Sequence, residues 1–140
     1  MKNAVLIQKF IEEIWNKQSF EMLDDFLHPA FEDHSLLPIL SPDKEGLKKW
    51  IAATGNSFEH ETVIEDQVAE GDKVIIRIKM KLKHIGIWRG IQATGVELST
   101  TGYRHFKCKD DRIVEHWALL DGEAIENKLK EASHGCTIAE

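Results

Sequence analysis

The predicted fold is built around one stretch of the sequence, Val74-Ile-Ile-Arg-Ile-Lys-Met-Lys-Leu-Lys-His84. Apolar side chains occupy every second position in it, and basic side chains fill most of the positions between them, which is the period of a half-buried β-strand. Two more strand-like runs follow at residues 98–109 and 112–120, joined by the short acidic turn Asp110-Asp111. The sequence therefore predicts three neighbouring antiparallel strands.

The rest of the chain supplies helices to cover that sheet. The other predicted elements are amphipathic helices at residues 3–16 and 20–27, a third helix from Ser41-Pro42-Asp43 to Thr54-Gly55-Asn56, a strand at 59–70 and a weak helix at 123–132. Because helices come first and strands last, we expect the α+β class: a curved antiparallel sheet with about three N-terminal helices on its concave face.

The length and net charge of the chain limit the number of domains and the kinds of partner that can be expected. The 140 residues are predicted to form one domain, 1–140, in which residues 133–140 have no pattern and form a tail. A formal net charge of -6 argues against nucleic acid as a partner, because phosphate binding needs a dominant basic surface. The basic positions between Val74 and His84 are interpreted as a solvated sheet face.

The cysteine content and the hydropathy of the chain indicate the cellular compartment in which it is expected. Cys108 and Cys136 are the only two cysteines, and they are too far apart for a zinc pair or a disulfide framework. We therefore expect free thiols in a reducing environment. No apolar run is long enough for a signal peptide or a bilayer span. The sequence predicts a cytoplasmic protein without a membrane partner.

The hairpin carries the candidate chemistry. Counting back from the Asp110-Asp111 turn places His105 opposite His116, although a β-bulge would shift this pairing. In the unshifted register, one face holds Tyr103, His105, His116 and Ala118. The other face holds Phe106, Cys108, Ile113, Glu115 and Trp117.

Two neighbouring imidazoles in the gap between sheet and helices would form an acid/base group, because burial and like charge keep at least one of them neutral near pH 7. Two alternatives stay open. The pair lies on the outer face or in a dimer interface, or it binds a metal. The metal site lacks a third ligand at standard spacing, so no metal is predicted.

Other polar residues have two interpretations each. Asp121 orients a histidine or acts as a base, or else it caps the helix that follows. Asp33 and His34 are pocket residues at the sheet edge, or a capping aspartate and a turn histidine. Arg104 and Glu115 fall diagonally across the predicted hairpin and are expected to pair.

Three motifs resemble the SnoaL-like polyketide cyclase and ester cyclase family of the NTF2-like superfamily. They are His84-x-Gly-x-x-x-Gly90, Ala93-Thr-Gly95, and Arg112-Ile-Val-Glu-His-Trp117 followed by Asp121. The similarity covers nearly the whole chain. It implies a cone-shaped α+β barrel, a homodimer through the outer sheet face, and a cofactor-independent site that closes a ring by intramolecular aldol condensation with an aspartate as acid/base.

This chain departs from the family pattern at one position. Relatives often carry an acidic residue directly after the tryptophan of the last strand, where this chain has Ala118. If that acid is the base, a histidine or Asp121 would have to substitute. We predict an enzyme of the cyclase or isomerase kind that acts on a small apolar or polyketide-like carbonyl compound.

The candidate residues follow from these arguments. The catalytic candidates are His116, His105 and Asp121. The ligand-binding candidates are His34, Trp50, His84, Trp88, Tyr103 and Trp117. A non-catalytic binding module with the same pocket, and a homodimeric structural protein with a filled cone, are the alternative hypotheses.

Overall fold

The computed structural model describes the backbone of residues 2–139 and the side chains of residues 2–133. The helical elements are α1 (Lys2–Phe10), the π-helical turn η1 (Ile11–Asn16), the 3-10 turn η2 (Phe20–Met22), α2 (Leu23–Phe26), α3 (Lys44–Ser57) and α4 (Gly122–Ala139). The strands are β1 (Leu27–Asp33), β2 (Phe58–Glu70), β3 (Lys73–His84), β4 (Glu97–Lys109) and β5 (Arg112–Leu120).

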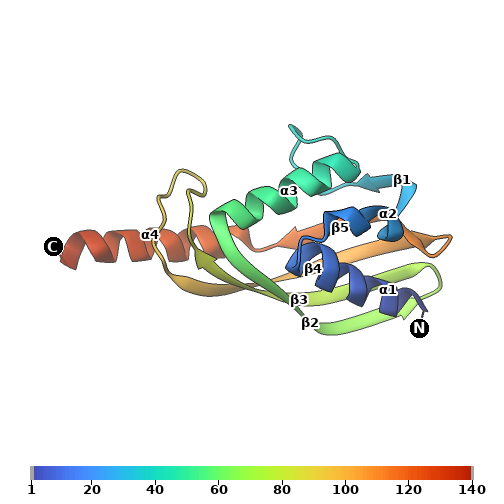
Figure 1. Ribbon diagram of the computed structural model, residues 1–140. Helices are drawn as coiled ribbons and strands as arrows, with labels where there is room; N and C mark the ends of the chain where they lie inside the picture. Colours follow the sequence, from blue (N-terminus) through green and yellow to red (C-terminus); the bar gives the residue numbers. More distant parts are fainter. Residues whose placement is uncertain (1, 140) are drawn as a thin grey trace.

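The five strands form one curved, unclosed sheet in the order β1-β5-β4-β3-β2 (Figure 1). The strands from β2 to β5 pair antiparallel, whereas β1 pairs parallel with β5. The sheet is therefore mixed, which corrects the purely antiparallel prediction. No strand was expected at β1 because Pro29 interrupts it and its burial does not alternate, so the period of two is missing.

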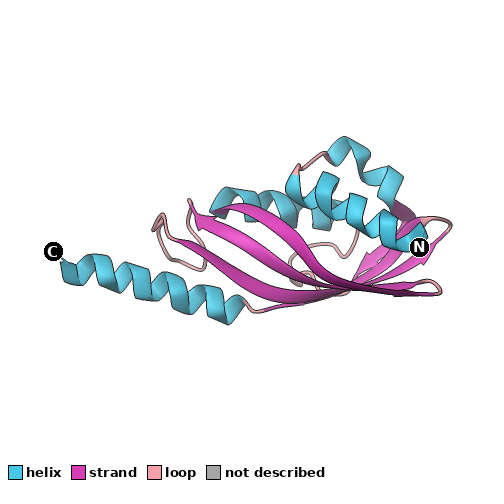
Figure 2. Cartoon of the chain, turned by 90° about the horizontal axis from the view of Figure 1, so that it is seen from below, coloured by secondary structure: helices cyan, strands magenta, loops and turns pink. Residues whose placement is uncertain are grey.

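The helices α1, α2 and α3 lie over a single face of the sheet, whereas α4 extends away from one end of it (Figure 2). On β3 the inward side chains Val74, Ile76 and Ile78 are fully buried, and they pack in one core with residues of α1, η1 and α3. This confirms the alternating pattern and the α+β class. Among the described residues, the opposite face of the sheet has no helix over it.

The boundaries of the helices differ from the predictions. The Asp43 carboxylate accepts a hydrogen bond from the Gly46 backbone N–H at 3.1 Å, so a helix does start at the predicted signal, but Asp43 is its N-cap and Pro42 lies outside it. The helix ends one residue beyond the predicted Thr54-Gly55-Asn56, at Ser57, and passes directly into β2. Likewise, α4 continues to Ala139, through the backbone of the predicted tail.

The β4–β5 hairpin contains the most consequential correction. Asp110 and Asp111 both have positive φ, 53° and 63°, as a two-residue type I′ turn requires. A β-bulge follows, in which Val114 is left without a partner. The pairs on either side of the bulge are Cys108–Ile113 and Lys107–Glu115. A bulge of this kind adds one residue to one strand and displaces all later pairs by one position.

The displaced register separates the two histidines that were expected to pair. His116 lies opposite Phe106 and points inward, whereas His105 lies opposite Trp117 on the outer face. The expected His105–His116 pair is therefore wrong. Phe106, Cys108 and Ile113, which were assigned to the outer face, belong to the buried core.

Candidate functional site

A cavity of about 380 Å³ opens between α3 and the inner face of the sheet. Trp50 of α3 and Trp88 of the loop after β3, two of the ligand-binding candidates, both line it. Its lining includes three buried ionisable residues, Asp33, Arg104 and His116, each of them at most 4% exposed, and the exposed Arg89. The site is thus an apolar hollow with a few convergent polar groups, as is usual for small-molecule sites.

Asp33 and His116 form a buried pair at the wall of this cavity. The parallel pairing of β1 with β5 places the two residues side by side, and Asp33 Oδ2 lies 2.9 Å from His116 Nδ1. The other carboxylate oxygen of Asp33 accepts hydrogen bonds from the Ser35 backbone N–H at 2.9 Å and from the Ser35 hydroxyl at 2.7 Å. The carboxylate is therefore fixed in position by both of its oxygens.

Arg104 determines which nitrogen of His116 carries the proton. Arg104 Nη1 lies 3.4 Å from His116 Nε2. Because arginine can only donate, Nε2 must accept, and the proton of the neutral ring is on Nδ1, where it is donated to Asp33. The Arg104 guanidinium also lies over the Trp15 ring, 4.3 Å from its centre, in a cation–π contact.

Burial, nearby charges and hydrogen bonds shift the pKa values of His116 and Asp33. Burial lowers the pKa of His116 below its usual 6.5, and the charges of Arg104 and His105 add to this effect, although Asp33 opposes it. Burial raises the pKa of Asp33, but hydrogen bonds from His116 and Ser35 outweigh burial and hold it below 3.8. The pair at neutral pH is therefore a carboxylate and a neutral imidazole.

Four of the predicted site residues lie on the outer face instead of in the cavity: His34, Tyr103, His105 and Trp117. The His34 ring stacks on Trp117 with ring centres 4.7 Å apart, and His105 contacts the other side of this aromatic group at 5.0 Å from Trp117. Tyr103 is 51% exposed. The bulge explains this outcome for the hairpin residues, because it reverses which residues of β4 share a face with His116.

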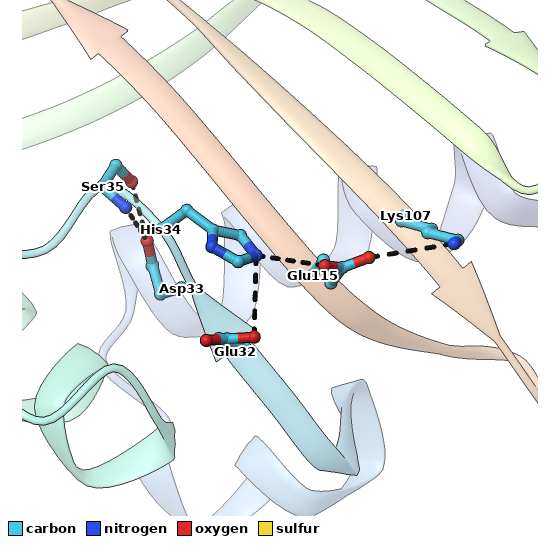
Figure 3. Close-up of polar contacts among 6 residues, drawn as sticks. All are labelled: Glu32, Asp33, His34, Ser35, Lys107 and Glu115. Atoms are coloured by element: carbon cyan, nitrogen blue, oxygen red, sulfur yellow. Dashed lines mark hydrogen bonds and ion pairs between the residues drawn. The ribbon is translucent and has the colours of Figure 1, made fainter.

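His34 belongs to a polar group that joins the end of β1 to Glu115, which lies within β5 (Figure 3). His34 Nε2 lies 3.1 Å from Glu115 and 3.8 Å from Glu32, and Glu115 also pairs with Lys107 at 3.8 Å. The expected pair of Arg104 with Glu115 is wrong, since the two residues point to opposite faces. One nitrogen and two carboxylate oxygens of His34, Glu32 and Glu115 lie within 4.8 Å of one another, a spacing that their ion pairs explain.

Two further predicted residues have structural roles. Asp121 accepts a hydrogen bond from the Ala124 backbone N–H at 2.9 Å, so it caps α4, which is the alternative that the sequence left open. His84 is fully buried, and its Nδ1 accepts from the Thr94 backbone N–H at 3.1 Å. This contact holds the glycine-containing loop against β3, and His84 does not line the cavity.

Arg104 is the cavity residue that the sequence reasoning missed. It occupies an inward position of β4, between the buried residues Gly102 and Phe106. An arginine in phase with buried positions is the signal that identifies it, but the unshifted register placed it on the outer face. The Cys108 thiol is free and buried, whereas the Cys136 side chain lies outside the described part of the chain.

The chain is similar to proteins of one family over most of its length. The sequence profile of the SnoaL-like polyketide cyclases matches residues 5–129. None of the curated proteins matches the chain significantly in sequence. Within residues 2–139, no helix combines the length and the apolar character that crossing a membrane demands.

Solved structures share the fold. IdmH from Streptomyces antibioticus, a proposed polyketide cyclase, has a TM-score of 0.83 at 24% identity, over 93% of this chain and 99% of its own. TsrD from Streptomyces laurentii has a TM-score of 0.81 at 24% identity, over 91% and 94%. AclR from Streptomyces galilaeus, a proposed hydroxylase, has a TM-score of 0.80 at 20% identity, over 92% and 96%. At these identities the similarity concerns the fold alone.

Proposed function

The chain belongs to the SnoaL-like polyketide cyclase family, and we propose that it is a cofactor-independent enzyme that removes a proton next to the carbonyl group of a small apolar compound. Ring closure of the aldol type or isomerisation follows from the resulting enolate. The observation that carries the proposal is the buried pair of Asp33 and His116, 2.9 Å apart at the wall of the cavity.

His116 Nε2 is the base in this proposal. Its lone pair is held only by the long 3.4 Å contact with Arg104, and its low pKa keeps the ring neutral and able to accept a proton at pH 7. When Nε2 takes the proton, the Asp33 carboxylate stabilises the imidazolium through Nδ1. This division of roles is that of a base oriented by a buried acid.

The positive charge of Arg104 favours the enolate. Negative charge develops on the carbonyl oxygen as the proton leaves, and a fixed cation in a cavity of low polarity lowers the free energy of that state. In ring closure, the enolate carbon forms a bond to a second carbonyl carbon of the same molecule. The oxygen of that carbonyl then takes the proton from His116, so the base is regenerated.

Ala118 supports a histidine base over an acidic one. It lines the cavity and lies opposite Arg104 in the β4–β5 pairing, at the position where relatives often carry an acidic residue. The described cavity wall therefore has no carboxylate at this point. Of the catalytic candidates from the sequence, His116 keeps its proposed role, while His105 and Asp121 lie outside the cavity lining.

The outer face of the sheet fits a homodimer, which is part of the proposal. The large apolar side chains on it include Leu119, 77% exposed, and Val68, 63% exposed. Adjacent pairing of Ile75 with His105 and of His105 with Trp117 makes this surface continuous across the strands. Exposed apolar patches of this kind mark sites of association.

The free thiol of Cys108 supports the proposed cytoplasmic location.

The proposal is tested by proton exchange, which requires no knowledge of the natural substrate. The wild-type protein is incubated in D₂O with small cyclic ketones such as 2-tetralone, and loss of the proton next to the carbonyl is followed by NMR. We expect catalysed exchange that His116→Gln reduces by roughly 10²-fold or more. His34→Gln, on the outer face, is the matched control and retains the rate.

The opposite result favours the non-catalytic alternative. If ketones raise the melting temperature but exchange no faster than in buffer, the chain binds ligands without acting on them. Equal exchange rates in wild type and His116→Gln would remove His116 from the base role.

A further inference from the structure

Arg104 has two hydrogen-bond donors that nothing in the described part of the chain accepts. The residue lines the cavity and is 2% exposed, and its Nε and Nη2 groups are buried without partners. Only Nη1 reaches an acceptor, His116 Nε2, at 3.4 Å. A buried donor without an acceptor costs free energy, because it has lost its hydrogen bond to water and gained none in the protein. A ligand that supplies acceptors therefore recovers free energy at this residue.

The two free donors share one edge of the guanidinium group. The Nε–H and one N–H of Nη2 point in the same direction in the plane of the group, while Nη1 is on the other side and faces His116. Two parallel donors match the two oxygens of a carboxylate, which bind as a pair of charge-assisted hydrogen bonds. This buried, unpaired edge of Arg104 thus has the geometry that recognises a carboxylate.

The remaining polar groups of the cavity also favour an anion. Trp15, which lines the cavity, has a buried indole N–H without an acceptor. Both oxygens of Asp33 are occupied, and the hydroxyls of Thr54 and Ser57 donate to backbone carbonyl groups at 2.9 and 2.8 Å. The described lining therefore offers unused donors to a ligand, and its only carboxylate is already bonded.

The charge on Arg104 persists under physiological conditions. Burial lowers its pKa to about 10, with Asp33 opposing the shift, so the guanidinium is cationic at neutral pH. Asp33 lies beyond the His116 ring, since it contacts the opposite nitrogen of that ring. The His116 ring therefore separates the Asp33 carboxylate from the guanidinium group.

We propose that the cavity binds a carboxylic acid, whose carboxylate is held by the Nε and Nη2 groups of Arg104 and whose apolar body lies against Trp50 and Trp88. The inference rests on the proposed function in placing the substrate in the same cavity, and it adds the substrate class. It does not depend on proton transfer by His116.

The test compares two ligands of the same shape, one with a charged carboxylate and one with a neutral carboxamide. Binding of 2-naphthoate and of 2-naphthamide, its neutral counterpart of the same shape, is measured by calorimetry at pH 7. We expect the wild-type protein to bind the acid roughly tenfold more tightly. Arg104→Gln removes this preference, and Arg104→Lys reduces it, because lysine keeps the charge but not the paired donors. Arg77→Gln, on the outer face, is the control and changes nothing.

Several results would overturn the inference. These are equal affinity for the two compounds in wild type, no saturable binding of naphthoate, and a full preference that survives in Arg104→Gln or Arg104→Lys. If a substituted protein fails to fold, the wild-type comparison still decides. His116→Gln separates the two proposals, because it is expected to abolish proton exchange while leaving the preference for the acid intact.

Discussion

Asp33 Oδ2 and His116 Nδ1 lie 2.9 Å apart although 83 positions of the sequence separate the two residues. The parallel pairing of β1 with β5 brings them together, and both side chains are almost completely buried. The rest of the site is arranged around this contact, since Asp33 accepts the Nδ1 proton of His116 while Arg104 donates to Nε2, so both contacts select the same tautomer.

Asp33→Asn is expected to reduce ketone proton exchange by roughly 10²-fold or more, because an amide cannot stabilise the imidazolium as a carboxylate does. It should also lower the free energy of unfolding by about 1–3 kcal/mol through loss of a buried charge-assisted hydrogen bond. Urea unfolding measures the second effect. Asp66→Asn, on the exposed surface, serves as the control, and equal stability of the two variants would contradict the importance of the pair.

Stability is expected to fall as the solution becomes acidic. The folded pKa of His116 is below 6.5 and that of Asp33 is below 3.8, so the unfolded chain binds more protons than the folded one. For His116 the loss begins as pH falls through about 6.5, and for Asp33 it begins below about pH 4. Urea unfolding between pH 7.5 and 5 measures the slope. His116→Gln should flatten it, and an unchanged slope would argue against a buried neutral imidazole.

Leu119→Lys is expected to convert the proposed dimer into a monomer. The side chain is 77% exposed on the bare sheet face, and an added charge there must be desolvated when two copies associate. Light scattering coupled to size-exclusion chromatography gives the mass of each variant. Ile39→Lys, at a position that is 88% exposed in the loop before α3, should leave the mass unchanged. A monomeric wild-type protein would refute the dimer.

Ala118→Asp tests whether the unpaired donors of Arg104 bind a carboxylate, because it supplies one from within the protein. Residue 118 lies opposite Arg104 on the inner face, so a carboxylate introduced there is within reach of the unused donors. We expect the variant to fold and to lose its preference for 2-naphthoate over 2-naphthamide, since the new carboxylate occupies the site. Ala118→Asn, which adds no charge, should keep at least part of the preference. Tighter binding of naphthoate by Ala118→Asp would be the contrary finding.

The sequence predicted the parts of the fold that local periodicity controls. The predictions of a strand at β3 and of a turn at Asp110-Asp111 were both correct, because a half-buried strand and a tight hairpin turn each require their own residue pattern. The bulge at Val114 has no such pattern. It depends on how the sheet twists and packs, and one added residue was enough to move His105 out of the cavity and Arg104 into it.

The contact between Asp33 and His116 was beyond the reach of sequence reasoning for a different reason. The Asp33 segment has no period of two, and parallel pairing of distant strands depends on the whole fold. The sequence pointed to Asp33 as a possible pocket residue and to His116 as a base. Only their arrangement in space joins them.

NMR can observe the tautomer and the pKa of His116 in the folded protein. Histidine labelled with ¹⁵N is followed by long-range ¹H–¹⁵N NMR between pH 4.5 and 8, and His116 is assigned among the seven histidines by its absence in His116→Gln. We expect a ring protonated on Nδ1 alone at pH 7, with a pKa below 6.5. A ring protonated on Nε2 at pH 7, or a pKa above 6.5, would rule out a neutral His116 base oriented by Asp33.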